Sequence, residues 1–197
     1  MALKASSQYA LLCEQYLTIL YQKIQYTSHN NNNISETYGE ILYAGMNKLL
    51  SKIKFTDQDI FIDIGSGLGK IVAQVFLHSN VKEAHGIEIS PDLHSLATAI
   101  AERIQTELPH FYEGNRKLNF ILGNFLETPM LPATIAFINA ICLPPTLLHA
   151  LGDIINNTTS IHTVLTTRPI PTLQRLSFKK TIHIQCSWDS ALCYVYQ

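Results

Sequence analysis

The stretch Asp59–Gly69, DIFIDIGSGLG, decides the fold. Its first half is an almost continuous apolar run, which is typical of a strand buried on both faces of a parallel sheet. Glycines follow at 65, 67 and 69, and Lys70–Leu77 after them is expected to be helical. Glycines between a strand and a helix let the backbone turn tightly and approach a ligand without Cβ clashes. We therefore expect a ligand at this turn.

The spacing of the glycines indicates which ligand the loop binds. The third glycine comes two residues after the second, and Lys70 stands where a dinucleotide-binding GxGxxG motif would have glycine. Asp63 precedes the loop, and Glu88 ends the next expected strand, where an acid can accept hydrogen bonds from ribose hydroxyls. These features favour an adenosyl ligand with an amino-acid end over a pyrophosphate. The alternative is an ordinary tight turn with a solvent-facing acid.

On both sides of this stretch, the sequence patterns of strands and helices alternate. Helices are expected at 9–24, 42–53, 91–104 and 147–155, the third with Ser90 as N-cap and Pro91 at its first position. Strands are expected at 59–64, 84–89, 118–122, 135–139 and 162–166. Two final runs, 181–186 and 191–196, are expected to form an antiparallel pair. The pattern predicts a Rossmann-like α/β fold, with a mostly parallel seven-stranded sheet, an antiparallel C-terminal edge and helices on both faces.

One catalytic domain is expected. The chain has 197 residues, which suits a single α/β domain. The asparagine run Asn30–Asn33 favours a loop, so we divide the chain into an N-terminal helix and linker, 1–33, and a catalytic domain, 34–197.

Composition excludes several classes of protein. The apolar fraction is 47%, without the ~18 continuous apolar residues that cross a bilayer. The four cysteines form no CxxC pair and the eight histidines no HExxH motif, so we expect reduced thiols and no metal. The net charge of −1, from 14 basic and 15 acidic residues, argues against general nucleic-acid binding.

A second motif follows the third expected strand. Gly123–Leu126, GNFL, offers a polar residue, Asn124, and an aromatic one, Phe125, which can bond to and stack on an adenine ring. Alone, the motif is equally consistent with a turn and a core phenylalanine.

Together these segments resemble the Dot-one (disruptor of telomeric silencing) class of protein-lysine methyltransferases, over about Tyr38–Tyr196. The resemblance is carried by TYGE at 37–40, KFTDQDIFIDIGSGLG at 54–69, GIE at 86–88, GNFL at 123–126, AFIN at 136–139, and Ser187, Trp188 and Tyr194 near the end. It implies a class I methyltransferase that uses S-adenosylmethionine.

The resemblance also implies roles for individual residues. Cofactor binding is expected from Tyr38, Gly39, Glu40, Asp63, Gly65, Ser66, Gly67, Gly69, Glu88, Asn124, Phe125 and Asn139. Asn139 is expected beside the transferred methyl group, with Trp188 and Tyr194 as walls of the lysine channel. The structural alternatives for Trp188 and Tyr194 are a core tryptophan on a hairpin and a core tyrosine on the last strand.

Several positions depart from the family's pattern. Ile41 stands for a threonine, Lys70 for a glutamine, Asn124 for an aspartate and Ala140 for a second asparagine, and the turn between Trp188 and Tyr194 is one residue shorter. These departures bear on the substrate and the shape of the pocket more than on the fold.

The expected activity is methylation of a protein lysine, with a histone as one candidate substrate. A non-histone protein, a small amine, or a non-catalytic cofactor-binding module are the alternatives. The basic residues look scattered, and the basic extension of animal members is expected to be missing, so nucleosome binding by the isolated chain should be weak. We expect a cytoplasmic or nuclear protein that does not associate with membranes. The oligomeric state is left open, and so is whether this is a microbial protein that is delivered to a host cell.

Overall fold

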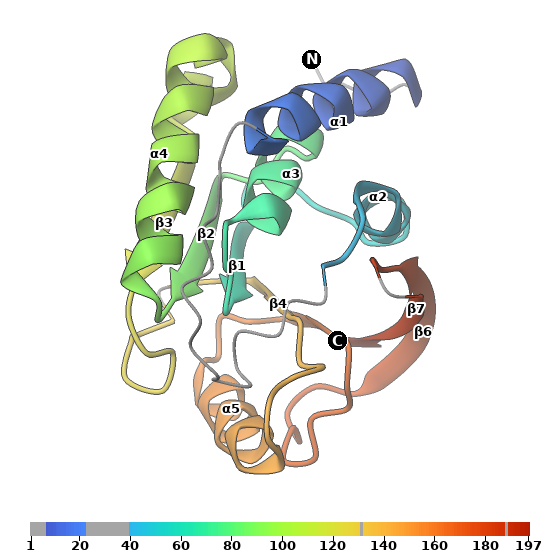
Figure 1. Cartoon of the computed structure of the whole chain (residues 1–197). Coiled ribbons are helices and arrows are strands. Elements are labelled where there is room, and N and C mark those ends of the chain that lie inside the picture. Colours follow the sequence, from blue (N-terminus) through green and yellow to red (C-terminus); the bar gives the residue numbers. More distant parts are fainter. Residues whose placement is uncertain (1–6, 23–39, 131, 188) are drawn as a thin grey trace.

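The computed structural model describes residues 7–22, 40–130, 132–187 and 189–197. It contains a seven-stranded sheet with the order β3-β2-β1-β4-β5-β7-β6 (Figure 1). The first five strands of that order are parallel, and β7 lies antiparallel between β5 and β6. The predicted fold class, including the antiparallel C-terminal edge, is confirmed.

The strands lie close to where the sequence predicts them. They are β1 (Ile60–Ile64), β2 (Glu83–Glu88), β3 (Lys117–Leu122), β4 (Ile135–Ile138), β5 (Thr163–Thr166), β6 (Phe178–Gln185) and β7 (Ser190–Tyr196). β6 begins three residues before the predicted strand. Its first four residues are all exposed, so they lack the alternation of buried and exposed residues that marks a strand in a sequence.

Helices cover both faces of the sheet (Figure 1). They are α1 (Ser7–Gln22), α2 (Tyr43–Leu50), α3 (Lys70–His78), α4 (Pro91–Glu107) and α5 (Pro145–Asn157), with a 3-10 segment, η2, at Pro109–Asn115. Ser90 caps α4 as predicted, accepting from the Leu93 N–H. None of the helices in the described ranges is long and apolar enough to span a bilayer.

Two apolar cores lie on opposite faces of the sheet. Phe61 and Phe137 point to the face covered by α1 to α4, while Ile62 and Ala136 pack with Leu151 of α5 on the other. All five are fully buried. The apolar run of β1 is therefore buried on both sides, as a central parallel strand should be.

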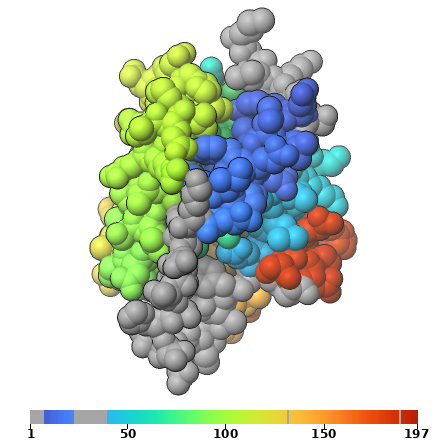
Figure 2. Space-filling model, turned by 45° about the horizontal axis from the view of Figure 1, so that its top comes forward, coloured from blue at the N-terminus to red at the C-terminus, as the bar shows by residue number. Residues whose placement is uncertain are grey.

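α1 packs on the first of these faces, between α4 and α2 (Figure 2). The Tyr9 hydroxyl donates to the Leu77 carbonyl at 2.9 Å, and the Tyr21 hydroxyl donates to the Leu68 carbonyl at 3.1 Å. The second bond ties the end of α1 to the glycine loop. The predicted asparagine-rich linker lies outside the described residues, and so do Tyr38 and Gly39 of the predicted catalytic domain.

Candidate active site

Two cavities open at the carboxyl ends of β1, β2 and β4. The chain order of the parallel strands reverses between β1 and β4, and ligands of open α/β sheets bind at such a switch point. The smaller cavity is lined by Asp63, Glu40 and Lys70, and the larger, of about 420 Å³, by Glu88 and Phe125. Gly65, Gly67 and Asn139 line both, so the cavities meet beside the glycine loop.

The glycine loop is folded back onto β2. The N–H groups of Gly65 and Ser66 both donate to the Ile87 carbonyl, at 2.9 and 3.0 Å. Gly65, Gly67 and Gly69 have φ values of +78°, +54° and +77°, which residues with a Cβ rarely adopt. A Cβ on Gly65 would meet nothing within 4 Å, so open space lies directly over the backbone there. This open space would allow a ligand to approach the backbone closely, as the sequence predicts.

Glu88 is fixed by backbone donors. One carboxylate oxygen, Oε2, accepts from the Gly67 N–H and the other, Oε1, from the Ser90 N–H, both at 2.8 Å. The side chain is 7% exposed and still lines the larger cavity. Each carboxylate oxygen can accept more than one hydrogen bond, so Glu88 keeps acceptor capacity for a ligand hydroxyl.

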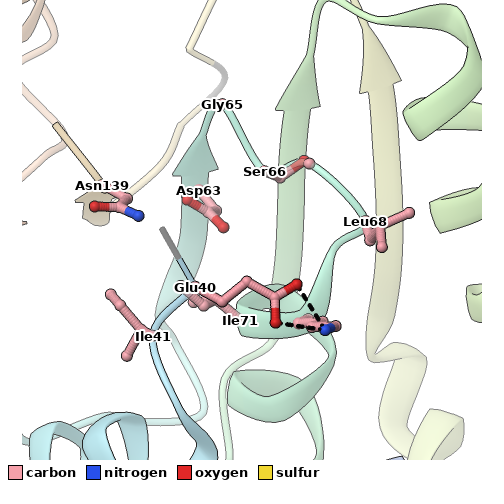
Figure 3. A pocket seen from close by; sticks show the side chains of 10 residues that line it. Glu40, Ile41, Asp63, Gly65, Ser66, Leu68, Ile71 and Asn139 are labelled. Carbon is pink, nitrogen blue, oxygen red and sulfur yellow. Dashed lines mark hydrogen bonds and ion pairs between the residues drawn. The ribbon is translucent and has the colours of Figure 1, made fainter. Parts of the chain in front are cut away.

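Asp63 is a buried carboxyl at the end of β1. Among the described residues, none donates a hydrogen bond to it or forms an ion pair with it. Burial, and then the negative charge of Glu88, raise the pKa of Asp63 to about 8. Figure 3 shows its side chain between Asn139 and Glu40, inside the smaller cavity. A cationic group of a ligand would find an acid there that can ionise against it.

Lys70 is the cation of the smaller cavity. Its Nζ lies 2.7 Å from both carboxylate oxygens of Glu40, and 5.4 Å from the centre of the Tyr21 ring. Figure 3 shows the ion pair, as dashed lines at the Glu40 carboxylate, below Asp63. The lining therefore includes a buried acid and a lysine paired with Glu40, groups that a ligand with both an ammonium and a carboxylate could engage.

Asn139 follows β4 and is held by the next strand. The Thr167 hydroxyl donates to Asn139 Oδ1 at 3.1 Å and accepts from the Ala140 N–H at 2.8 Å. The oxygen of the amide is thereby oriented. Because Asn139 lines both cavities, it lies where the two halves of a bound molecule would join.

The far end of the larger cavity is mainly apolar. Phe125 and Leu126 line it beside Asn124, whose Oδ1 accepts from the Leu126 N–H at 3.0 Å and shapes the turn. The opposite wall is formed by residues 141–144 and Leu147. An aromatic side chain and apolar walls suit a flat base such as adenine.

Most predicted site residues line these cavities, but among the described ones Gly69 and Tyr194 do not, and Tyr38 and Gly39 lie outside the described residues. Tyr194 lines neither cavity; it belongs to β7, and its ring centre is 6.3 Å from that of Phe178. Trp188 lies outside the described residues. Sequence reasoning missed the wall at 141–147, although the pair Pro144 and Pro145 signals a loop leading into a helix.

The sequence does not predict two sets of hydrogen bonds that support the site. Arg168 Nη1 donates to the carbonyls of Ala140 and Leu143, at 3.2 and 2.6 Å, and so supports that wall. The Thr167 contact to Asn139 joins residues 28 positions apart. No local pattern in the sequence signals either contact.

Comparison with known proteins identifies a family. Residues 16–187 match the family model described as "Histone methylation protein DOT1". A relative from Caenorhabditis elegans, named "Histone-lysine N-methyltransferase, H3 lysine-79 specific", is 26% identical over 163 residues, 79% of this chain and 17% of its own length. A Drosophila melanogaster protein of the same name is 28% identical over 122 residues, 60% of this chain and 7% of its own. The chain thus spans less than a fifth of these relatives.

Solved structures share the fold at low identity. The methyltransferase domain of bacterial CtHen1 has a TM-score of 0.61 and 12% identity, covering 78% of this chain and 97% of its own. An RNA methyltransferase from Salinibacter ruber, in complex with S-adenosyl-L-homocysteine, has a TM-score of 0.52 and 20% identity, covering 76% of this chain and 88% of its own. These likenesses show the Rossmann-like methyltransferase fold.

Proposed function

Because the chain belongs to the DOT1 family of histone methylation proteins, we propose that it transfers a methyl group from S-adenosylmethionine to a protein lysine. One observation carries the proposal: Asp63 and Glu88 lie at adjacent strand ends on either side of the glycine loop, and Asn139 lines both cavities. The names of the relatives and the cofactor product in a structural neighbour support the same activity.

The cavities fit S-adenosylmethionine by their chemistry. In the smaller one, Asp63 would bind the ammonium and Lys70 the carboxylate of the methionine end. In the larger one, Glu88 would accept from the ribose hydroxyls, and Phe125 would contact the adenine. Asp63, a buried carboxyl to which no described residue donates a hydrogen bond, would gain a partner from such a ligand.

The bound cofactor would supply an electrophilic methyl group on a sulfonium. Its leaving group is a neutral thioether, so the chain needs no acid to protonate it. The nucleophile must be a neutral amine, whereas the pKa of a free lysine is about 10.4. A desolvated approach beside a positive charge favours the neutral amine. The protein's work is therefore to align the two groups, and alignment can contribute about 7 kcal/mol or more.

Asn139 is the residue we assign to this alignment. Its amide oxygen is oriented by Thr167, at the junction of the two cavities. Trp188 and Tyr194 would form the walls of the lysine channel, a part of the proposal that the family resemblance supports. Tyr38 and Gly39, with Glu40, would cover the methionine end.

The test compares two asparagines of the same site. Asn139→Ala should lower turnover at saturating cofactor more than it lowers cofactor affinity. Asn124→Ala, at the adenine end, should lower affinity and leave saturated turnover nearly unchanged. Affinity is measured by calorimetry and turnover with labelled cofactor. A loss confined to affinity in Asn139→Ala would remove this residue from the reacting centre.

The substrate is tested separately. The protein is incubated with labelled cofactor and with nucleosomes, free histones or cell lysate, and the label is located by mass spectrometry. We expect it on a lysine side chain, with a histone as the first candidate, which would place the protein in the nucleus. Label on a nucleobase or a small amine would overturn the lysine assignment, and absence of turnover despite cofactor binding would indicate a binding module.

A further inference from the structure

The lysines and arginines among the described residues fall into groups according to the atoms with which they interact. Lys70, Arg103 and Lys117 form ion pairs with glutamates. Three arginines donate to backbone carbonyls instead: Arg116, Arg168 and Arg175. The lysines that pair with no described carboxylate are Lys48, Lys52, Lys54, Lys82, Lys179 and Lys180.

All of these lysines except Lys82 lie on neighbouring parts of the molecule, in and after α2 and at the start of β6. They come from two segments, 42–56 and 177–187, that α2 and β6 bring together. The Lys180 ammonium donates to the Lys52 carbonyl at 3.2 Å, and the Leu42 N–H donates to the Gln185 carbonyl at 3.0 Å. Figures 1 and 2 show α2 beside the C-terminal strands. We call Lys48, Lys52, Lys54, Lys179 and Lys180 the basic corner.

The basic corner is exposed and free of nearby acids in its own segments. All five side chains are exposed. Neither segment contains an aspartate or glutamate; the next acids along the chain are Glu40 and Asp57 around the first, and Asp189 after the second. Glu40 is engaged by Lys70. Five positive charges are thus concentrated on a protein whose net charge is −1.

Protection of an exposed sheet edge does not explain this cluster. Lysines on edge strands do discourage strand pairing between molecules, and β6 is an edge strand. However, Lys48, Lys52 and Lys54 belong to α2 and the segment that follows it, where no strand edge needs protection. A charge cluster drawn from two elements points to a polyanionic partner.

The side chains indicate which polyanion. The corner holds only lysines, which bind phosphate as point charges, whereas planar carboxylates are matched best by arginine. It also lacks a series of exposed rings on which successive bases could stack: Phe55 packs toward Phe61, and Phe178, which is 55% exposed, lies beside Tyr194 and Tyr196. Stacking is the usual means of holding single strands. We propose that the basic corner binds the phosphate backbone of double-stranded DNA.

This inference goes beyond the proposed methyl transfer and does not depend on it. The corner includes the start of β6, while the candidate site lies at the carboxyl end of the parallel strands. DNA bound there would leave the cavities open. If the substrate is a histone within a nucleosome, the corner would tether the enzyme by the DNA that accompanies its target.

The test measures binding of a labelled DNA duplex by fluorescence anisotropy across salt concentrations. Each phosphate contact contributes about 0.9 to the salt slope, so five lysines allow a slope of at most about 4.5. Lys52→Gln with Lys179→Gln should lower that slope by about 1.8 and the affinity about 30-fold at 0.15 M salt. The matched control is Lys82→Gln with Lys117→Gln, which changes the net charge equally but lies at the opposite end of the sheet and should change neither quantity.

Three results would overturn the proposal: equal losses in the control, tighter binding of single-stranded RNA that the same double variant abolishes, or displacement by polyglutamate at lower charge concentration than by DNA. The last would make the corner a protein-docking surface. Methylation of free histones separates this test from the proposed function. The Lys52→Gln/Lys179→Gln variant should retain that activity and lose only DNA binding, whereas failure of methyl transfer would leave the DNA result standing.

Discussion

Asp63 is a carboxyl group that the fold buries almost completely. Its pKa is raised to about 8, against about 3.9 for an unfolded aspartate, so the folded protein binds this proton more tightly than the unfolded chain does. Tighter proton binding by Asp63 in the folded protein contributes to the free energy of unfolding. This contribution is fully present below about pH 4 and is lost as pH rises toward 8. Asp63→Asn should therefore make the ligand-free protein more stable at pH 8 than the unsubstituted chain. It should also make the free energy of unfolding less dependent on pH between pH 5 and 8. Urea unfolding at both pH values measures this.

The same carboxyl predicts a proton signature for cofactor binding. An ammonium placed against Asp63 favours the carboxylate, so binding near pH 7 should release a proton and tighten as pH rises toward 8. Calorimetry in two buffers with different ionisation enthalpies counts that proton. Asp63→Asn should remove the effect and weaken binding. Proton release that persists unchanged in the variant would assign it to another group.

Lys70 stands where the resembling family has glutamine, and its partner is Glu40. Both side chains are about one-third exposed, so the pair should contribute no more than about 1 kcal/mol to stability. Lys70→Gln should instead weaken S-adenosylhomocysteine, which carries an amino-acid end, and spare methylthioadenosine, which lacks one. Competition binding with the two ligands tests this difference. Equal losses for both would mean that Lys70 acts only through the fold of the loop.

At the scale of elements, the glycine loop joins three parts of the fold. β1 leads into it, β2 accepts its N–H groups through Ile87, and α1 reaches it through Tyr21. Gly67→Arg should abolish cofactor binding, because its side chain would enter the junction of both cavities. Folding should survive, since Gly67 lines both cavities and belongs to neither apolar core; circular dichroism checks this. Near-normal binding by a folded variant would place the ligand elsewhere.

At the scale of the molecule, local patterns predict local structure and miss distant contacts. Asp63, the glycines and Glu88 were predictable because a strand, a turn and a helix each leave a periodic or compositional mark. The contact between Thr167 and Asn139 and the pairing of Glu40 with Lys70 depend on the packing of separate elements. The basic corner is the clearest case. Lys52 and Lys180 are 128 residues apart, and lysines that look scattered along the sequence meet only when α2 packs on β6.

The last prediction concerns stability of the whole chain. The two cavities connect loops after β1, β2, β3 and β4, so a molecule filling both should stabilise the native state as a unit. At about 100 times its Kd, a ligand adds about 2.7 kcal/mol. For a domain of this size, each kcal/mol raises the Tm by about 2–4 °C. S-adenosylmethionine and S-adenosylhomocysteine should therefore raise the Tm by about 5–11 °C, measured by differential scanning fluorimetry. NAD should leave it unchanged, because Lys70 occupies the place of the third glycine of a dinucleotide motif. A larger shift with NAD than with S-adenosylhomocysteine would contradict the assignment of both cavities.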